Sequence, residues 1–245
     1  MRGFAVFAIL MPAAASAQTA PVDQSQAWQP ATPYVTAGQD EPGYRSWYLA
    51  APWRAGQVKA FNDYLTTWEV AGIVPTWQLL RTATDWQKCG ADPFEVPPSE
   101  TWPNVVQTLR YIRDQVIPAI GPVEPVSAYR NDALNACAHG AAESAHRYFA
   151  AVDLVPLKPM TREALIHDLC ALHADSGERY GVGLGFYAFL RFHIDSRKFR
   201  KWGAGSGPEA APCLAEPPPQ PIVASPSPPP TTPPPISSPI TPPKR

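Results

Sequence analysis

A segment near residue 193 alternates apolar and ionisable side chains, and this alternation could gather several groups capable of chemistry. In LRFHIDSR the alternation runs from Leu190 to Arg197. Successive side chains of a β-strand point to opposite faces, so the pattern predicts a strand with His193 and Asp195 on one face. A core strand with a solvated polar face would show the same alternation. Spacing alone therefore leaves the role of these two side chains open.

A second segment, SAHRYFAAVDL, places a histidine and an aspartate around a turn. His146 precedes a turn-like stretch, and Asp153 lies inside AAVDLVP, which predicts an apolar strand. An unpaired buried carboxylate is strongly unfavourable, so Asp153 needs an arginine, backbone amides or a metal ion as its partner. Zinc accepts imidazole nitrogen and carboxylate oxygen together, and a catalytic zinc has three protein ligands and a water.

A longer stretch, VSAYRNDALNACAHGAAESAHRYFAAVDL, resembles the signature of the zinc D-Ala-D-Ala carboxypeptidases. Their relatives are the D-Ala-D-Ala dipeptidases of vancomycin resistance and the hedgehog-like domains. The family pattern is a S-x-Y-R turn, then S-x-H-x-x-G-x-A-x-D, then a strand that ends in a further histidine. The matching residues in this sequence are Ser127, Tyr129, Arg130, Ser144, His146, Ala151, Asp153 and His193.

The resemblance, which covers roughly residues 100–202, implies a zinc ion bound by His146, Asp153 and His193. The implied activity is hydrolysis of D-Ala-D-Ala-type bonds in peptidoglycan stem peptides. Zinc would supply an activated water and polarise the carbonyl. A carboxypeptidase and a cross-link endopeptidase would use the same site. A catalytically inactive zinc module that binds peptidoglycan or a protein is the alternative.

The resemblance also implies that the first turn contacts substrate, through Arg130 with Tyr129 and Ser144 beside it. A guanidinium binds a carboxylate with two parallel hydrogen bonds, so Arg130 could select peptides with a free terminal carboxylate. We therefore assign Arg130 both a catalytic and a substrate-binding role.

Two positions depart from the family pattern. Phe149 stands where the family has glycine, so we expect a turn that does not rely on positive φ. Leu190 stands where many relatives carry a catalytic carboxylate. Asp195 is then the leading catalytic carboxylate, with Glu143 and Glu178 as reserves. The alternative for Asp195 is an acceptor that orients a ligand or pairs with an arginine.

The remaining sequence predicts the elements that hold these residues. Apolar residues recur at helical spacing in four segments, with Ser99, Asn131 and Thr161 as caps for three of them. The predicted helices cover residues 58–68, 99–118, 131–140 and 161–172, and the predicted strands cover 122–130, 150–156 and 183–196. Helices and strands do not alternate regularly, so we expect an α+β fold with a small, mainly antiparallel sheet and helices packed on it. The resemblance implies a hedgehog or D,D-peptidase-like arrangement.

The two ends of the chain differ in composition from its middle. Residues 1–17 combine one arginine, an apolar run and an Ala-Ser-Ala end, which predicts a cleaved signal peptide. Residues 18–43 lack apolar periodicity and predict a flexible leader, and the proline-rich residues 207–245 predict a disordered tail. Residues 44–206 are long enough for one domain with its own core.

The expected export signal affects what we predict for the location of the chain, its partners and its cysteines. No segment reaches the roughly 20 apolar residues of a membrane-spanning helix, so we expect no membrane span and a periplasmic location. The net charge of −1 gives no support for nucleic-acid binding, and nothing indicates the oligomeric state. Cysteines of an exported chain predict disulfides, with three pairings open. They are Cys89, Cys137, Cys170 and Cys213.

Overall fold

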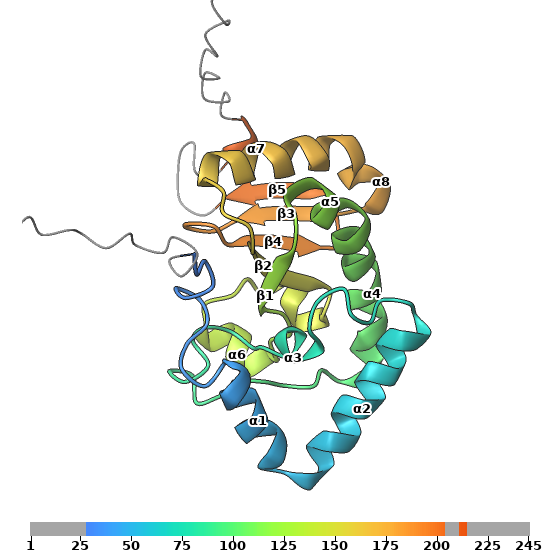
Figure 1. Ribbon diagram of the computed structural model, residues 1–245, viewed down its shortest axis with the longest axis vertical. Coiled ribbons are helices and arrows are strands. Elements are labelled where there is room, and N and C mark those ends of the chain that lie inside the picture. The colour runs from blue at the N-terminus through green and yellow to red at the C-terminus, as the bar shows by residue number, and fades with distance from the viewer. Residues whose placement is uncertain (1–27, 204–210, 215–245) are drawn as a thin grey trace, which may run out of the picture. The chain divides into compact units, whose positions relative to one another are not determined.

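The computed structural model describes residues 28–203 and 211–214 (Figure 1). The expected signal peptide, residues 1–17, lies outside the described residues, as does most of the expected tail. Within the described residues, no helix is both long and apolar enough to cross a membrane.

A five-stranded sheet forms the centre of the described chain, with the strand order β1-β2-β4-β3-β5. All neighbouring strands pair antiparallel except β3 and β5, which pair parallel. The strands are β1 (Val123–Ser127), β2 (Ala151–Pro156), β3 (Gly183–Phe186), β4 (Phe192–Asp195) and β5 (Arg200–Gly203). The expected α+β class with a mainly antiparallel sheet is confirmed.

Helices surround this sheet and follow most of the predicted segments. The α-helices are α1 (Glu41–Leu49), α2 (Pro52–Thr67), α3 (Thr76–Leu79), α4 (Trp102–Tyr111), α5 (Ile117–Ile120), α6 (Asp132–Cys137), α7 (Arg162–Leu172) and α8 (Glu178–Tyr180). Shorter 3₁₀ segments are η1 (Ser99–Thr101), η3 (Ala145–Tyr148) and η6 (Pro212–Leu214), and π-helical segments are η2 (Ile112–Val116) and η4 (His173–Gly177).

The caps decide where these helices begin. The side chains of Asn131 and Thr161 accept hydrogen bonds from backbone amides at the first turns of α6 and α7, as predicted. Ser99 makes no such cap, because it opens the 3₁₀ segment η1 instead. The helical stretch that begins at Trp102 runs through α4, η2 and α5 to Ile120. It therefore continues past Pro118, near which we expected it to end.

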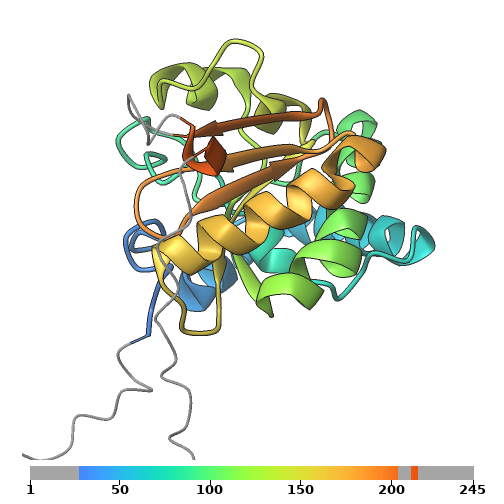
Figure 2. The same ribbon diagram turned by 90° about the horizontal axis from the view of Figure 1, so that it is seen from above.

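The two faces of the sheet have different chemistry. Figure 2 shows α7 along one face and α6 on the opposite side. On the first face, alternate apolar side chains of the strands join the main core with side chains of α4 and α7. These strand residues are Val152, Leu154, Leu184, Phe186, Phe192 and Ile194. The intervening residues therefore point to the face away from α7.

The segment 183–196, which we expected as one strand, forms a hairpin. Strands β3 and β4 are joined by a turn in which the Tyr187 amide donates to the carbonyl of Arg191 over 3.0 Å. Phe189 has a φ of 53° in this turn. An apolar aromatic residue in the left-handed region is uncommon, so the turn carries no sequence signal of the usual glycine or asparagine kind.

The described domain extends beyond both of the expected boundaries. Tyr34 and Gln39 are buried, although we expected residues 18–43 to form a leader that packs little. A tyrosine ring and an amide can anchor a segment even without apolar periodicity. At the other end, a disulfide joins Cys213 to Cys170 of α7, so the domain does not end at residue 206.

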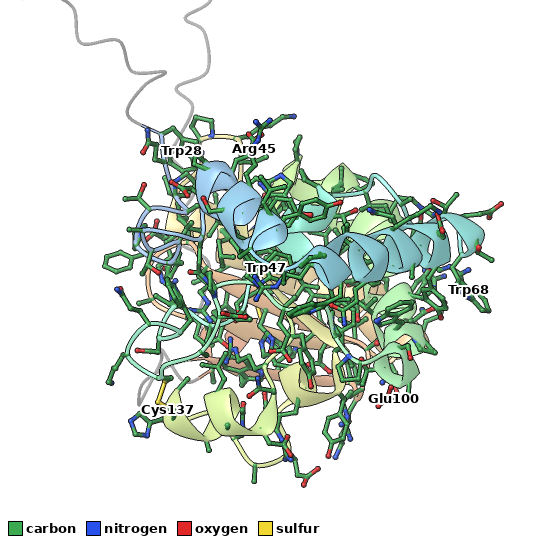
Figure 3. The ribbon with its side chains drawn as sticks, turned by 90° about the horizontal axis from the view of Figure 1, so that it is seen from below. Trp28, Arg45, Trp47, Trp68, Glu100 and Cys137 are labelled. Atoms are coloured by element: carbon green, nitrogen blue, oxygen red, sulfur yellow. A yellow bond between two sulfur atoms is a disulfide. The ribbon has the colours of Figure 1, made fainter. Side chains whose placement is uncertain are left out.

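Both predicted disulfides are present, and the pairing is now defined. Cys89 pairs with Cys137, and Cys170 pairs with Cys213. Figure 3 shows the first disulfide at the end of α6. Each bond ties a loop or segment with little regular structure to a helix.

Phe149, the residue in the glycine position of the motif, does adopt a positive φ of 51°. Our expectation of a turn without positive φ is therefore wrong. The ring is fully buried, and it contacts the rings of Phe61 and Tyr129 with centroids 5.7 and 6.3 Å apart. Packing of the aromatic ring thus stabilises a backbone conformation that glycine would adopt without strain.

We expect the Phe149→Gly substitution to destabilise the protein by about 1–4 kcal/mol in urea unfolding. Loss of a buried phenylalanine costs about 3–5 kcal/mol, whereas relief of the left-handed backbone returns only about 1–2 kcal/mol. Phe189→Gly is the matched control, because Phe189 has the same backbone region but is 67% exposed. Equal stability changes in the two variants would contradict the packing explanation.

Candidate metal centre

The register of the sheet brings together the aspartate and the second histidine of the motif. Asp153 of β2 lies directly opposite His193 of β4, and both point to the face away from α7. Asp195 lies two residues further on the same face of β4. Glycines of β3, Gly183 and Gly185, lie opposite them. A Cβ at Gly183 would come within 2.2 Å of an Asp195 oxygen, so this face has room only for glycine there.

The remaining histidine enters from the 3₁₀ segment before β2. His146 of η3 is 1% exposed, and its Nδ1 lies 2.5 Å from the backbone carbonyl of Ala128. A carbonyl only accepts hydrogen bonds, so Nδ1 carries the proton and donates. The other ring nitrogen, Nε2, then has a lone pair directed at Asp153 and His193.

Three ligand atoms of this group converge on one point. His146 Nε2 lies 3.2 Å from both Asp153 Oδ1 and His193 Nδ1, and the last two atoms are 2.9 Å apart. All three side chains are buried. The structure therefore confirms that these residues form a group that could hold a metal ion.

The tautomer of His193 is set from the opposite side of its ring. Its Nε2 lies 3.0 Å from Asp195 Oδ2. Burial would raise the pKa of Asp195, but the hydrogen bond to His193 holds that pKa below its ordinary value, so the carboxylate is ionised and accepts. Nε2 then carries a proton, which leaves the Nδ1 lone pair directed at the centre.

Three acceptor atoms in contact require a cation between them. In the absence of metal, a proton on His193 serves this purpose. Burial lowers the pKa of His193, but its hydrogen bonds to Asp153 and Asp195 outweigh burial and raise it. Burial and the charge of Arg130 lower the pKa of His146 to about 4, so this ring stays neutral.

The distances also suit a tetrahedral ion. Bonds of about 2.0–2.1 Å from zinc to nitrogen and oxygen place neighbouring ligand atoms about 3.3 Å apart. The observed separations of 2.9–3.2 Å need only a slight opening of the group. Two neutral imidazoles and one carboxylate also leave a fourth position for water or substrate, as catalytic zinc sites do.

The second oxygen of Asp153 is held by two arginines. Arg130 Nη2 lies 2.7 Å from Asp153 Oδ2, and Arg191 contacts the same oxygen. Burial would raise the pKa of Asp153, but the charge of Arg191 and the hydrogen bond from His193 hold it well below its usual range. Asp153 is thus ionised, with Oδ2 used by guanidinium groups and Oδ1 directed at the histidines.

Asp195 lies on the far side of His193 from the candidate metal position. Its carboxylate also accepts from the backbone amide of Arg197 over 2.9 Å and pairs with Arg200 over 2.8 Å. This placement fits the alternative that we left open, in which Asp195 orients a ligand. Glu178, one of the reserves, lies on α8 and does not line the cavity described below.

We expect Asp195→Asn to weaken zinc binding by about 10- to 100-fold, because it removes the acceptor that fixes the His193 ring and its tautomer. Competition with a zinc-binding dye would measure the change. Asp114→Asn, in an exposed aspartate paired with Arg113, is the control and should leave the affinity unchanged. An Asp195 variant with the affinity of the wild type would show that His193 needs no orienting partner.

A cavity of about 790 Å³ opens beside the three candidate ligands, and His146 and His193 line it. It is rich in cations. The positively charged residues that line it are Arg130, Arg191, Arg197, Lys198 and Arg200. Among the described residues, the carboxylates that line it are Asp85 and Glu143. The cavity therefore favours an anionic ligand.

The expected substrate residues do not all reach this cavity. Arg130 and Ser144 line it. Tyr129 does not line it, because its ring packs in the core against Phe149. The apolar strand before Tyr129 and the buried Phe149 together explain this placement.

Sequence reasoning did not assign a role to three other residues of the cavity. Arg191 contacts Asp153, Tyr187 lies under the Arg191 guanidinium at 4.0 Å, and Trp202 packs against the His193 ring at 5.4 Å. Burial, then the charge of Asp153, raises the pKa of Tyr187 to about 12, so its hydroxyl is a donor. The alternation in LRFHIDSR could have pointed to Arg191. Tyr187 and Trp202 depend on the hairpin and on the parallel pairing of β5.

No family model, curated protein or solved structure matches this chain.

Proposed function

We propose that the protein is a zinc-dependent peptidase that releases the last residue from peptidoglycan stem peptides ending in D-Ala-D-Ala. One observation carries the proposal. Two buried imidazole nitrogens and a buried carboxylate oxygen lie within 3.2 Å of one another, and they do so beside a cationic cavity. A structural zinc site would be closed, whereas this group has three ligands and an accessible side.

His146, Asp153 and His193 would hold the ion. When bound, zinc supplies an activated water and polarises the substrate carbonyl. Two neutral imidazoles and one carboxylate are the ligand set that catalytic zinc sites use, and hard oxygen-preferring ions such as Mg²⁺ favour fewer nitrogens. The backbone carbonyl of Ala128 and the carboxylate of Asp195 keep both imidazoles in the orientation that ligation requires.

Glu143 is the residue that we propose as proton acceptor. It lines the cavity with the two histidines, and its carboxylate accepts a hydrogen bond from the Tyr148 hydroxyl over 3.2 Å. Its position in the loop before η3 leaves it exposed, so it can receive a proton from the attacking water and pass it to the leaving amine. Asp195 is engaged with His193 and orients that ligand instead.

Arg130, Arg191 and Tyr187 bind the substrate in this proposal. The two guanidinium groups are fixed by Asp153, and each has further N–H donors available to a terminal carboxylate or a developing oxyanion. The protonated hydroxyl of Tyr187 can donate to the same oxygen atoms. These groups would favour peptides with a free carboxyl end over internal bonds.

The second candidate is a zinc-containing binding module without activity. Leu190 favours it, since this residue packs against the core in the position where related enzymes would carry their acid. A domain that keeps zinc without a correctly placed carboxylate would bind a peptide end and not cleave it.

The test compares cleavage of two peptides by the zinc-loaded full chain. We expect D-Ala release from a stem pentapeptide that ends in D-Ala-D-Ala, and we expect a chelator to abolish it and added zinc to restore it. The same peptide with its terminal carboxylate amidated should react far more slowly. Stoichiometric zinc without any release would support the binding module, and equal cleavage of the amidated peptide would support an endopeptidase.

A further inference from the structure

The loop after β4 places two cations on the cavity that the proposed reaction does not use. Arg197 and Lys198 are exposed and line the cavity beside His146 and His193. In the described part of the chain, neither forms a salt bridge with a carboxylate. Arg130 and Arg191, by contrast, are both paired with Asp153. The charges of the loop are therefore available to a ligand.

Arg197 is also held in one position. Its guanidinium stacks over the ring of Tyr148 at 3.8 Å from the ring centroid. Its backbone amide donates to Asp195, the carboxylate that orients His193. A stacked guanidinium loses less conformational freedom on binding an anion than an unrestrained side chain does, so this position is suited to recognition.

Arg197 lies at the junction of two cavities. The larger one contains the candidate metal ligands, and a smaller one of about 280 Å³ is lined by Asn104, Tyr148, Ala150, Ser196 and Arg197. An extended peptide that leaves the larger cavity on this side would pass the guanidinium before it reaches the smaller one.

The polar groups of the smaller cavity are already engaged with one another. Asn104 donates to the carbonyl of Tyr148 over 2.8 Å, and the Ser196 hydroxyl donates to the carbonyl of Asn104 over 3.1 Å while it accepts from Thr108 over 3.0 Å. The charged group that this cavity offers to a ligand is thus Arg197.

We propose that Arg197, with Lys198 beside it, binds a second carboxylate of the substrate. This inference rests on the proposed peptidase function and deepens it. The substrate class is an acidic peptide that carries a side-chain carboxylate upstream of the bond to be cleaved, in addition to its terminal carboxylate. The terminal carboxylate binds near Arg130 and Arg191, and the upstream carboxylate binds at Arg197.

The experiment measures the binding of two peptides to the zinc-loaded full chain. Both end in D-Ala-D-Ala with a methylene in place of the last amide nitrogen, which prevents cleavage, and they differ only by glutamate or glutamine upstream. We expect the glutamate peptide to bind roughly 2- to 5-fold more tightly, as for a well-placed exposed ion pair. The difference should decrease with added salt.

Two variants show whether Arg197 is responsible. In Arg197→Gln most of the preference for glutamate should be lost, with the affinity of the glutamine peptide almost unchanged. Arg179→Gln is the matched control, because Arg179 is an exposed arginine over the ring of Tyr180 and lies outside both cavities. It should retain the full preference for glutamate.

Three results would overturn the inference: no preference for glutamate in the wild type, a preference that persists undiminished in Arg197→Gln, or no binding of either peptide. Failure of the peptidase proposal would give a different experimental result. A protein that prefers the glutamate peptide through Arg197 but releases no D-Ala from a cleavable peptide would retain the anion subsite and lose the assignment as an enzyme.

Discussion

We expect replacement of His146 with alanine to lower the affinity for zinc by about 10²- to 10³-fold and to abolish release of D-Ala. The free energy of zinc binding to four-ligand structural sites in small peptides is about 10–16 kcal/mol. One ligand therefore contributes several kcal/mol to binding. His146 contributes its Nε2 to the centre, whereas Asp153 and its two arginines remain paired in the variant. The substitution therefore removes a ligand without leaving a buried charge unpaired.

The matched control for this experiment is His173→Ala. His173 is buried to the same degree and donates to the carbonyl of Val182 over 2.8 Å, but it does not line the cavity. Both variants should lose stability through a lost buried ring and hydrogen bond, and only His146→Ala should lose zinc. If His146→Ala bound one zinc per chain with the affinity of the wild type, our ligand assignment would be wrong.

Replacing Glu143 with glutamine should lower kcat for D-Ala release by about 10²- to 10⁴-fold, which is the usual contribution of a positioned acid or base. Zinc content and KM should change little, because the amide keeps the size of the side chain and Glu143 is not a candidate ligand. Steady-state kinetics with the stem pentapeptide, together with zinc analysis of each preparation, would measure both effects.

Asp85→Asn separates the role of Glu143 from the general charge of the cavity. Asp85 is the other carboxylate that lines the cavity in the described part of the chain. We expect its variant to keep kcat within about tenfold of the wild type. A large loss in Asp85→Asn with normal turnover in Glu143→Gln would transfer the role of base to Asp85.

Local rules predicted part of the convergence of the candidate ligands, and the family resemblance supplied the rest. Strand periodicity placed His193 and Asp195 on one face, and an aspartate inside an apolar strand required a partner. The resemblance to the zinc carboxypeptidases added His146 in the correct order. The structure brings His146, Asp153 and His193 within ligand distance.

The environment of the ligands could not be predicted, because it depends on pairing between distant segments. The hairpin at Phe189 has no glycine signal, and parallel pairing of β5 with β3 brings Trp202 to the His193 ring. The backbone carbonyl that fixes the His146 tautomer also belongs to another segment. A period-two pattern further shows which face Asp195 occupies but not which ring nitrogen it contacts.

X-ray absorption at the zinc edge of the zinc-loaded full chain tests the central claim most directly. We expect nitrogen and oxygen ligands at about 2.0–2.1 Å, with the multiple scattering of two imidazoles. The four cysteines are joined in disulfides, so no thiolate should contribute. Sulfur scattering near 2.3 Å, or a spectrum that His146→Ala leaves unchanged, would contradict the assignment of His146, Asp153 and His193 as the metal ligands.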